Sequence, residues 1–137
     1  MSLSGRCLCG VVRYELDADV RALVNCHCQF CRRAHGAAFV TTAPVPTRAL
    51  RFVAGAKHVA NYEGRFFCGK CATRLYNRSD AIPDTTALVV TSLDEEPAVA
   101  PSAHFNLESK APWFEIRDDA PRFDAFPPAV ATALESV

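Results

Sequence analysis

The sequence predicts a mainly β fold built from short antiparallel strands with a few helical turns. Residues 11–16 alternate, with Val12, Tyr14 and Leu16 on one face and charged side chains on the other, which is the period of a half-buried strand. Further runs are short and rich in β-branched or aromatic residues, and turn residues separate them. Prolines recur along the chain and break it into short segments.

The expected strands follow one another at short spacing. In order, they are the runs at residues 11–16, 20–25, 38–43, 50–53, 58–62, 87–92 and 103–107. Two helical pieces are expected. One covers Gln29 to His35, and the other covers Ala129 to Glu135, where Pro127 and Pro128 suit a helix start.

Length and charge limit the possible classes of protein. The chain has 137 residues and is half hydrophobic, so we expect one domain, residues 1–137, with its core at about residues 5–123. Fifteen basic residues balance fifteen acidic ones, which argues against a nucleic-acid partner. The N-terminus lacks the apolar stretch of a signal peptide, and the apolar runs are too short for a bilayer. We therefore expect a cytoplasmic protein without a membrane partner.

Seven cysteines are the most informative feature of the composition. The number is odd, so a framework made only of disulfides would leave one thiol over. A reducing cytoplasm also disfavours disulfides. The clustering therefore indicates metal or thiol chemistry.

Four of the cysteines form two pairs that suit one zinc ion. Cys7 and Cys9 are two residues apart, so in an extended chain both sulfurs point to one side, and Gly10 lets the backbone turn closely around an ion. Cys68 and Cys71 form a C-x-x-C with a glycine inside, which is typical of zinc knuckles. A redox dithiol is the other interpretation of C-x-x-C, but it needs a thioredoxin-like context that this chain lacks.

The other three cysteines, Cys26, Cys28 and Cys31, form C-x-C-x-x-C. Three protein ligands with a fourth position open is the general pattern of a catalytic zinc. Spacing alone leaves a second partition open, in which Cys28 and Cys31 pair with Cys7 and Cys9. A single zinc with three spare thiols is then the alternative.

A zinc ion held by three thiolates is a weak Lewis acid and is poorly suited to making hydroxide from water. The soft ligand set favours another sulfur in the open position, so the expected substrate is a small thiol. Arg32 and Arg33 follow the cluster and are candidates to bind a substrate carboxylate, although a solvated helix face would also explain them.

Histidines give a weaker signal. His27 lies between two candidate ligands and is expected to point away from the metal, while His35 and His58 have no metal-motif partner. His104 is the candidate acid or base, provided that its segment folds over the metal. Asp118 and Asp119 are interpreted as turn residues.

Several motifs in one order resemble the glutathione-dependent formaldehyde-activating enzyme family, which includes centromere protein V. They are "GRCLCGVVRYEL", "CHCQFCRRAHG", "FFCGKCATRLY", "VVTSLDEEPA" and "HFNLESKAPWFEI", and they run from about Gly5 to Phe123. One departure is visible, because family members often have a second glycine where this chain has Ala72.

This resemblance implies a β-tent fold with a zinc-ribbon-like element. It implies a structural zinc on Cys7, Cys9, Cys68 and Cys71 and a second, catalytic and weakly held zinc on Cys26, Cys28 and Cys31. The implied activity is that of a carbon–sulfur lyase that forms S-hydroxymethylglutathione from glutathione and formaldehyde.

Two other functions stay open at this point. The first is a non-enzymatic zinc-binding module for a protein partner, and the second is a thiol redox sensor that uses a low thiolate pKa beside Arg32 and Arg33. The segment from Leu107 to Ile116 is expected to wall the cleft, with Lys110 or Trp113 contacting the substrate. Packing of Trp113 and Phe114 against the core would explain the same segment.

Overall fold

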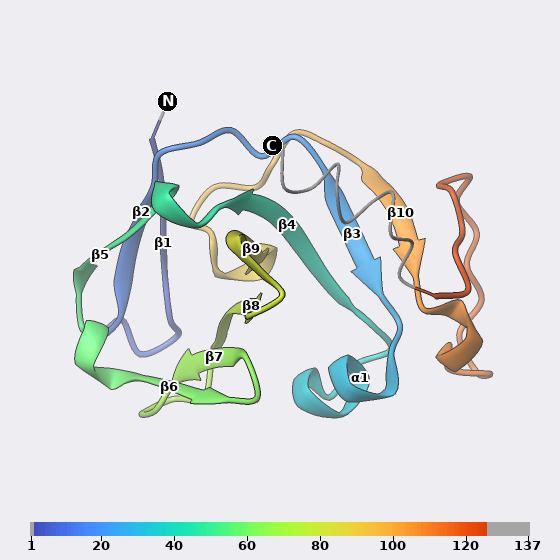
Figure 1. Ribbon diagram of the computed structural model, residues 1–137, viewed down its shortest axis with the longest axis horizontal. Coiled ribbons are helices and arrows are strands. Elements are labelled where there is room, and N and C mark those ends of the chain that lie inside the picture. The colour runs from blue at the N-terminus through green and yellow to red at the C-terminus, as the bar shows by residue number, and fades with distance from the viewer. Residues whose placement is uncertain (1, 126–137) are drawn as a thin grey trace.

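The computed structural model describes residues 2–125, and within them the chain is mainly β (Figure 1). One sheet has three strands in the order β1-β2-β5, and the other has seven in the order β10-β3-β4-β9-β8-β7-β6. The expected fold class is therefore confirmed. The strands are β1 (Leu3–Arg6), β2 (Arg13–Leu16), β3 (Leu23–Cys26), β4 (Val40–Pro46), β5 (Leu50–Ala54), β6 (Val59–Tyr62), β7 (Arg65–Cys68), β8 (Arg74–Ser79), β9 (Ile82–Val89) and β10 (Pro101–Phe105).

Helical structure is confined to short pieces. The α-helix α1 spans Gln29–His35, as the sequence predicts, and ends at Gly36, whose positive φ of 60° suits a left-handed helix cap. The 3-10 turns are η1 (Thr47–Ala49), η2 (Ala56–His58), η3 (Val90–Ser92) and η4 (Leu107–Ser109). The second expected helix, Ala129 to Glu135, lies outside the described residues. No helix within residues 2–125 is long and apolar enough to span a membrane.

Strand pairing is antiparallel with one exception, since β10 runs parallel to β3. All seven expected strands are present with shifted ends, whereas β1, β7 and β8 were not expected. Strand β4 also continues through Pro44 and Pro46, where an interruption was expected. The pairing of β4 with β3 ends at Thr42, so both prolines have a partner strand, β9, on one side only. The backbone N–H that proline lacks is therefore not needed on the other side.

The main core lies between the two sheets, which lean toward each other in Figure 1 with α1 below the end of β3. Alternate residues of β2 enter this core, as do Ala43 and Val45 of β4 and Leu88 of β9. Cys7 and Cys68 belong to the same cluster. Cys31 belongs to a separate cluster with Val40 and Val89, on which Cys26 and Cys28 pack. The two cysteine groups therefore rest on different parts of the interior.

Candidate metal centres and their cavities

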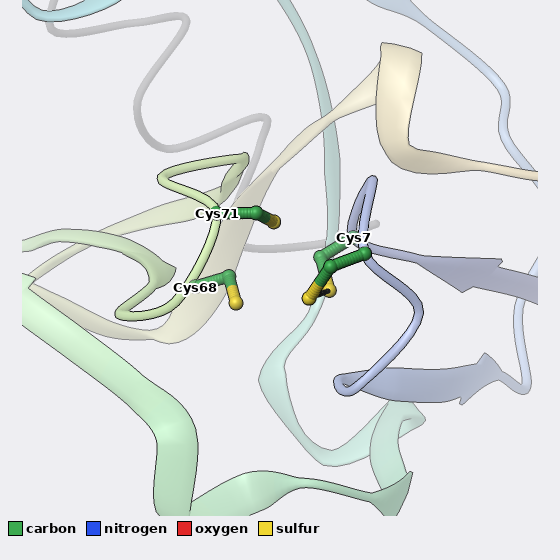
Figure 2. A group of neighbouring side chains, drawn as sticks. Cys7, Cys68 and Cys71 are labelled. Carbon is green, nitrogen blue, oxygen red and sulfur yellow. Dashed lines mark hydrogen bonds between the residues drawn. The ribbon is translucent and has the colours of Figure 1, made fainter.

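The first cysteine group joins two tight turns. Cys7 follows β1 and Cys68 ends β7, and the sulfurs of Cys7, Cys9, Cys68 and Cys71 all lie within 4.8 Å of one another. Figure 2 shows Cys7, Cys68 and Cys71 directed into one space between the turns. The backbone N–H of Leu8 donates to Thr73 Oγ1 at 2.9 Å, which ties one turn to the other.

Backbone N–H groups point at these sulfurs. Val12 N–H donates to Cys7 Sγ at 3.3 Å, and Lys70 N–H donates to Cys68 Sγ at 3.4 Å. Burial raises the pKa of Cys7, but the hydrogen bonds from Val12 N–H and neighbouring thiols outweigh it, and the net shift is downward. All four thiols are free of disulfides. Four converging sulfurs, two of which accept backbone N–H donors, fit a tetrahedral zinc site.

The turn of the second pair requires an unusual backbone. Ala72 has a φ of 67° and its N–H donates to the Cys68 carbonyl at 2.8 Å. This is the position where the family often carries glycine, so the substitution places an alanine in the left-handed region that glycine occupies without strain.

The second cysteine group lies where β3 meets α1. Cys26 ends β3, Cys28 caps the N-terminus of α1, and Cys31 lies in its first turn. Their three sulfurs lie within 4.8 Å of one another. The Cys31 N–H donates to Cys28 Sγ at 3.2 Å, so the helix start itself orients this thiol.

Asn106 is a further contact of this group that the sequence analysis missed. Its Nδ2 donates to Cys26 Sγ at 3.3 Å, and its φ of 61° is one that asparagine tolerates better than most residues. Asn106 directly follows β10, whose parallel pairing with β3 sets Phe105 beside Cys26. No local motif reveals this contact, because it depends on a pairing across 80 positions.

The pKa values of the three thiols shift in different directions. The hydrogen bond from the Cys26 thiol, and then that from Cys31, lowers the pKa of Cys28. The hydrogen bond with Cys28 raises the pKa of Cys26, and hydrogen bonds with Cys26 and then Cys28 raise the pKa of Cys31. Three close sulfurs that compete for protons form a soft donor set, which fits a thiophilic cation such as zinc.

His27 and His104 form a buried pair behind the second group. His27 Nε2 and His104 Nδ1 lie 3.0 Å apart, and His104 Nε2 lies 3.0 Å from Asp118 Oδ1 and Oδ2. Burial, and then the nearby His104, lowers the pKa of His27 to about 4. Both nitrogens of His104 therefore have protein partners, an arrangement that holds a ring in place. Asp118 does more than shape a turn, although its Oδ1 also accepts from Ala120 N–H as a turn residue would.

The two arginines after the cluster have different surroundings. Arg32 is half-buried and its Nη1 donates to Gln29 Oε1 and to the Ser109 carbonyl, at 3.1 and 2.9 Å. It therefore ties α1 to η4. Arg33 is exposed and lines a cavity.

Lys110 and Trp113 also differ from each other. Lys110 Nζ donates to the Ala111 and Phe114 carbonyls, which closes the loop after η4. Trp113 is 70% exposed, so it does not pin this segment to the core. Phe114 packs against Phe39, with ring centroids 5.3 Å apart.

One cavity is lined in part by the second cysteine group, and another is lined in part by α1. The first, which we call the apolar trough, measures about 230 Å³ and reaches Cys26 and Cys31. Its apolar lining consists of Val24, Val40, Pro44, Ile82, Ala87 and Phe105. The second, which we call the arginine groove, measures about 510 Å³. Its lining consists of Phe30, Arg33, Ala34, Tyr62, Arg65, Phe67 and Arg74.

Arg65 lines both cavities and is held firmly. Its guanidinium lies 3.8 Å from the centre of the Phe30 ring, and Nη1 donates to the Glu63 carbonyl at 2.9 Å. No aspartate or glutamate of residues 2–125 lines either cavity. The groove therefore presents three guanidinium groups and no opposite charge. The sequence did not point to Arg65 and Arg74, because they flank the Cys68/Cys71 pair and lie far along the chain from Cys26, Cys28 and Cys31.

Comparison with known proteins agrees with this geometry. Residues 2–109 match the family described as "Glutathione-dependent formaldehyde-activating enzyme". The chain belongs to this family. That match confirms the resemblance drawn from the sequence motifs.

Two relatives extend the comparison. A protein of Halomonas elongata, named "Putative glutathione-dependent formaldehyde-activating enzyme", is 27% identical over 128 residues, which cover 85% of this chain and 82% of that protein. A crystal structure of a Rhodobacter sphaeroides protein, a structural genomics target, has a TM-score of 0.57 at 26% identity. It covers 72% of this chain and 92% of that one. Family membership therefore points to chemistry on glutathione and formaldehyde, and both cysteine groups could hold metal ions.

Proposed function

We propose that this protein is a zinc-dependent carbon–sulfur lyase that forms S-hydroxymethylglutathione from glutathione and formaldehyde, or a related thiol–aldehyde adduct. The observation that carries the proposal is the position of Cys26, Cys28 and Cys31, whose sulfurs lie within 4.8 Å of one another beside the apolar trough, which Cys26 and Cys31 line. Membership of the family supports the same reaction class.

In this proposal the two cysteine groups have separate roles. Cys7, Cys9, Cys68 and Cys71 would hold a structural zinc, and Cys26, Cys28 and Cys31 would hold the second. When bound to three thiolates, zinc favours the thiolate form of a further sulfur ligand. Asn106 Nδ2 donates to Cys26 Sγ and would stabilise its thiolate when zinc is bound.

The reaction itself is an addition without redox change. The glutathione sulfur forms a bond to the aldehyde carbon, the C=O π bond opens, and the thiol proton ends on the oxygen. In the reverse direction the C–S bond breaks and that proton returns to sulfur. The protein has to bind the thiol, orient it and separate the reacting atoms from bulk water.

The arginine groove supports glutathione as the thiol, because glutathione carries two carboxylates. Arg33, Arg65 and Arg74 line the groove, and none of them forms an ion pair within the described residues. We assign to Arg33 the substrate contact and to Arg32 the positioning of η4. Lys110, Trp113 and His104 line neither cavity, so we assign His104 to holding His27 and not to proton transfer.

Exchange of formaldehyde with glutathione, followed by NMR in the presence of zinc, tests the activity. The uncatalysed reaction is the reference, and the protein should accelerate exchange above it in proportion to its concentration. No acceleration with zinc supplied would refute the lyase proposal. For the groove, Arg33→Ala should raise the KM for glutathione roughly tenfold, because a hydrogen bond to a charged partner is lost. Arg48→Ala, at an exposed residue of η1, is the matched control and should leave the KM unchanged.

A thiol redox sensor is the second candidate, and the lowered pKa of Cys28 favours it. That reading requires Cys28 to react with peroxide at a rate far above that of an ordinary thiol while zinc is present. Mass spectrometry of the peroxide-treated, zinc-loaded protein separates the candidates. Rapid oxidation of Cys28 without any formaldehyde exchange would favour the sensor.

A further inference from the structure

The apolar trough lies on the face of the seven-stranded sheet that is turned away from the main core. In β4, Ala43 and Val45 enter the core, while the alternate residues Val40 and Pro44 line the trough. In β9, Leu88 enters the core and its neighbour Ala87 lines the trough. The alternation of side chains along β4 and β9 therefore forms the trough on one face of the sheet and the core on the other.

Pairing places the trough floor in a row across the sheet. Pro44 pairs with Ala87, Ala87 with Asn77, and Asn77 with Arg65. Cys26 of β3 pairs with Val40 of β4, so the thiol lies on the same face as this floor. The trough thus begins at the cysteines and crosses the sheet toward β7.

The trough and the arginine groove differ in chemistry. Three arginines line the groove, and the lining of the trough is mostly apolar. Of residues 2–125, Arg65 is the one that lines both cavities. Arg78 borders the trough, but its side chain packs over Tyr76 and its Nε donates to Thr86 Oγ1 at 3.0 Å. A substrate with a charged half and an apolar half would match the two cavities.

Volume indicates the size of the apolar half. The trough measures about 230 Å³. A hydroxymethyl group has two heavy atoms and takes up little more space than one water molecule, ~30 Å³. The trough therefore has room for several further carbon atoms beside the reacting sulfur.

We propose that the apolar trough binds the aldehyde-derived part of the thiol adduct, so that the substrates are glutathione adducts of apolar aldehydes several carbons longer than formaldehyde. This inference rests on the proposed function and specifies its substrate class. The bonds change as in the formaldehyde reaction: the sulfur adds to the carbonyl carbon, the C=O π bond opens, and the thiol proton ends on oxygen. Only the alkyl chain on that carbon differs.

Binding of two stable thioethers tests the trough without catalysis. Calorimetry on the zinc-loaded protein compares S-hexylglutathione with S-methylglutathione. Each buried methylene contributes roughly a fourfold gain in affinity, so the hexyl compound should bind at least about tenfold more tightly even if the chain is only partly buried. Equal affinities, or no binding of the hexyl compound, would overturn the inference.

A filled trough provides the matched variant. Ala87→Leu adds volume at the trough floor and should reduce the hexyl-to-methyl affinity ratio to near one. Ala54→Leu makes the same change on an exposed residue of the three-stranded sheet and should keep the wild-type ratio. A ratio that Ala87→Leu leaves unchanged would also overturn the inference.

Exchange kinetics with hexanal and formaldehyde separate this inference from the function on which it rests. Acceleration with both aldehydes, and a lower KM for the hexanal adduct, is the expected result. Acceleration with formaldehyde alone would overturn the trough assignment and keep the lyase. Hexyl-selective binding without any exchange would refute the lyase and keep the trough as a binding site.

Discussion

The two cysteine groups present the same side chain in different numbers and on different parts of the interior. The first combines four thiols from two turns, and two of its members, Cys7 and Cys68, are 1% and 0% exposed within the main core. The second combines three thiols from one short segment at the mouth of a cavity. A closed set of four has no position for a substrate, whereas a set of three leaves one. Under the proposed function, the difference teaches that ligand number, more than ligand type, would separate a fold-holding site from a reactive one.

Chain connectivity deepens this contrast. Cys7 and Cys68 bring together segments sixty-one positions apart, and their turns connect β1 of one sheet with β7 of the other. Cross-linking so long a loop should remove much conformational freedom from the unfolded chain. Cys26, Cys28 and Cys31 span six residues, so their metal would constrain little beyond the start of α1.

The largest expected effect is that of Cys68→Ala in the first group. This change removes a ligand that is fully buried in the core, and structural zinc contributes ~10 kcal/mol or more of folding free energy in small zinc domains. Because that exceeds or equals the whole stability of many domains, we expect loss of cooperative unfolding and of solubility. Thermal melts followed by circular dichroism measure the loss of cooperative unfolding, and the soluble yield measures the loss of solubility. A soluble variant with the wild-type melting temperature would show that the first group is not structural.

Cys28→Ser tests the other side of the comparison. Zinc counting by mass spectrometry should give two ions per wild-type chain and one per variant chain when zinc is supplied before desalting. The melting temperature should change by only a few degrees, because Cys28 lies outside the main core. Formaldehyde exchange should fall at least about 100-fold, because loss of a ligand should cost no less than the ~10–100-fold typical of losing an outer-shell partner. Two retained zinc ions would rule out Cys28 as a ligand.

Asn106→Gly should have an intermediate effect that is confined to the second group. Glycine accepts the positive φ at this position but removes the N–H donor to Cys26 Sγ. Loss of such an outer contact typically costs roughly 10-fold or more in metal affinity or activity. Competition with a chelator measures the affinity of the weaker zinc site.

The same experiment has an internal control in the first group. The stronger zinc site should keep its wild-type affinity in Asn106→Gly, since Asn106 has no contact with that group in the described residues. Asn106→Asp keeps the size of the side chain but places a carboxylate beside the thiolate, so it should weaken the second site further. Equal weakening of both zinc sites would indicate a general loss of structure instead.

Sequence was informative where the signal is local. Cysteine spacing identified the candidate ligands but left their partition open, and the family resemblance implied the two groups. The short helix expected from Gln29 to His35 is observed with those ends. Sequence failed where distant segments meet, as for Asn106 against Cys26, or Asp118 against His104. It also treated prolines as interruptions, although Pro44 lies within β4, because the missing N–H matters only on the side where a partner strand is present. Which residues line a cavity depends on sheet register, and no short motif encodes register.

Ala72→Gly should produce the smallest effect, and it is a stabilising one limited to the first group. A non-glycine residue in the left-handed region costs roughly 1–2 kcal/mol, and Ala72 has a φ of 67°. Glycine relieves this strain but adds freedom to the unfolded chain, which returns about 0.4–1 kcal/mol. The free energy of unfolding should therefore rise by about 0.5–1 kcal/mol in urea titrations with saturating zinc. Ala98→Gly, an exposed loop alanine outside the positive-φ set, should show no gain. A fall in stability for Ala72→Gly would mean that the alanine methyl group packs usefully in the knuckle.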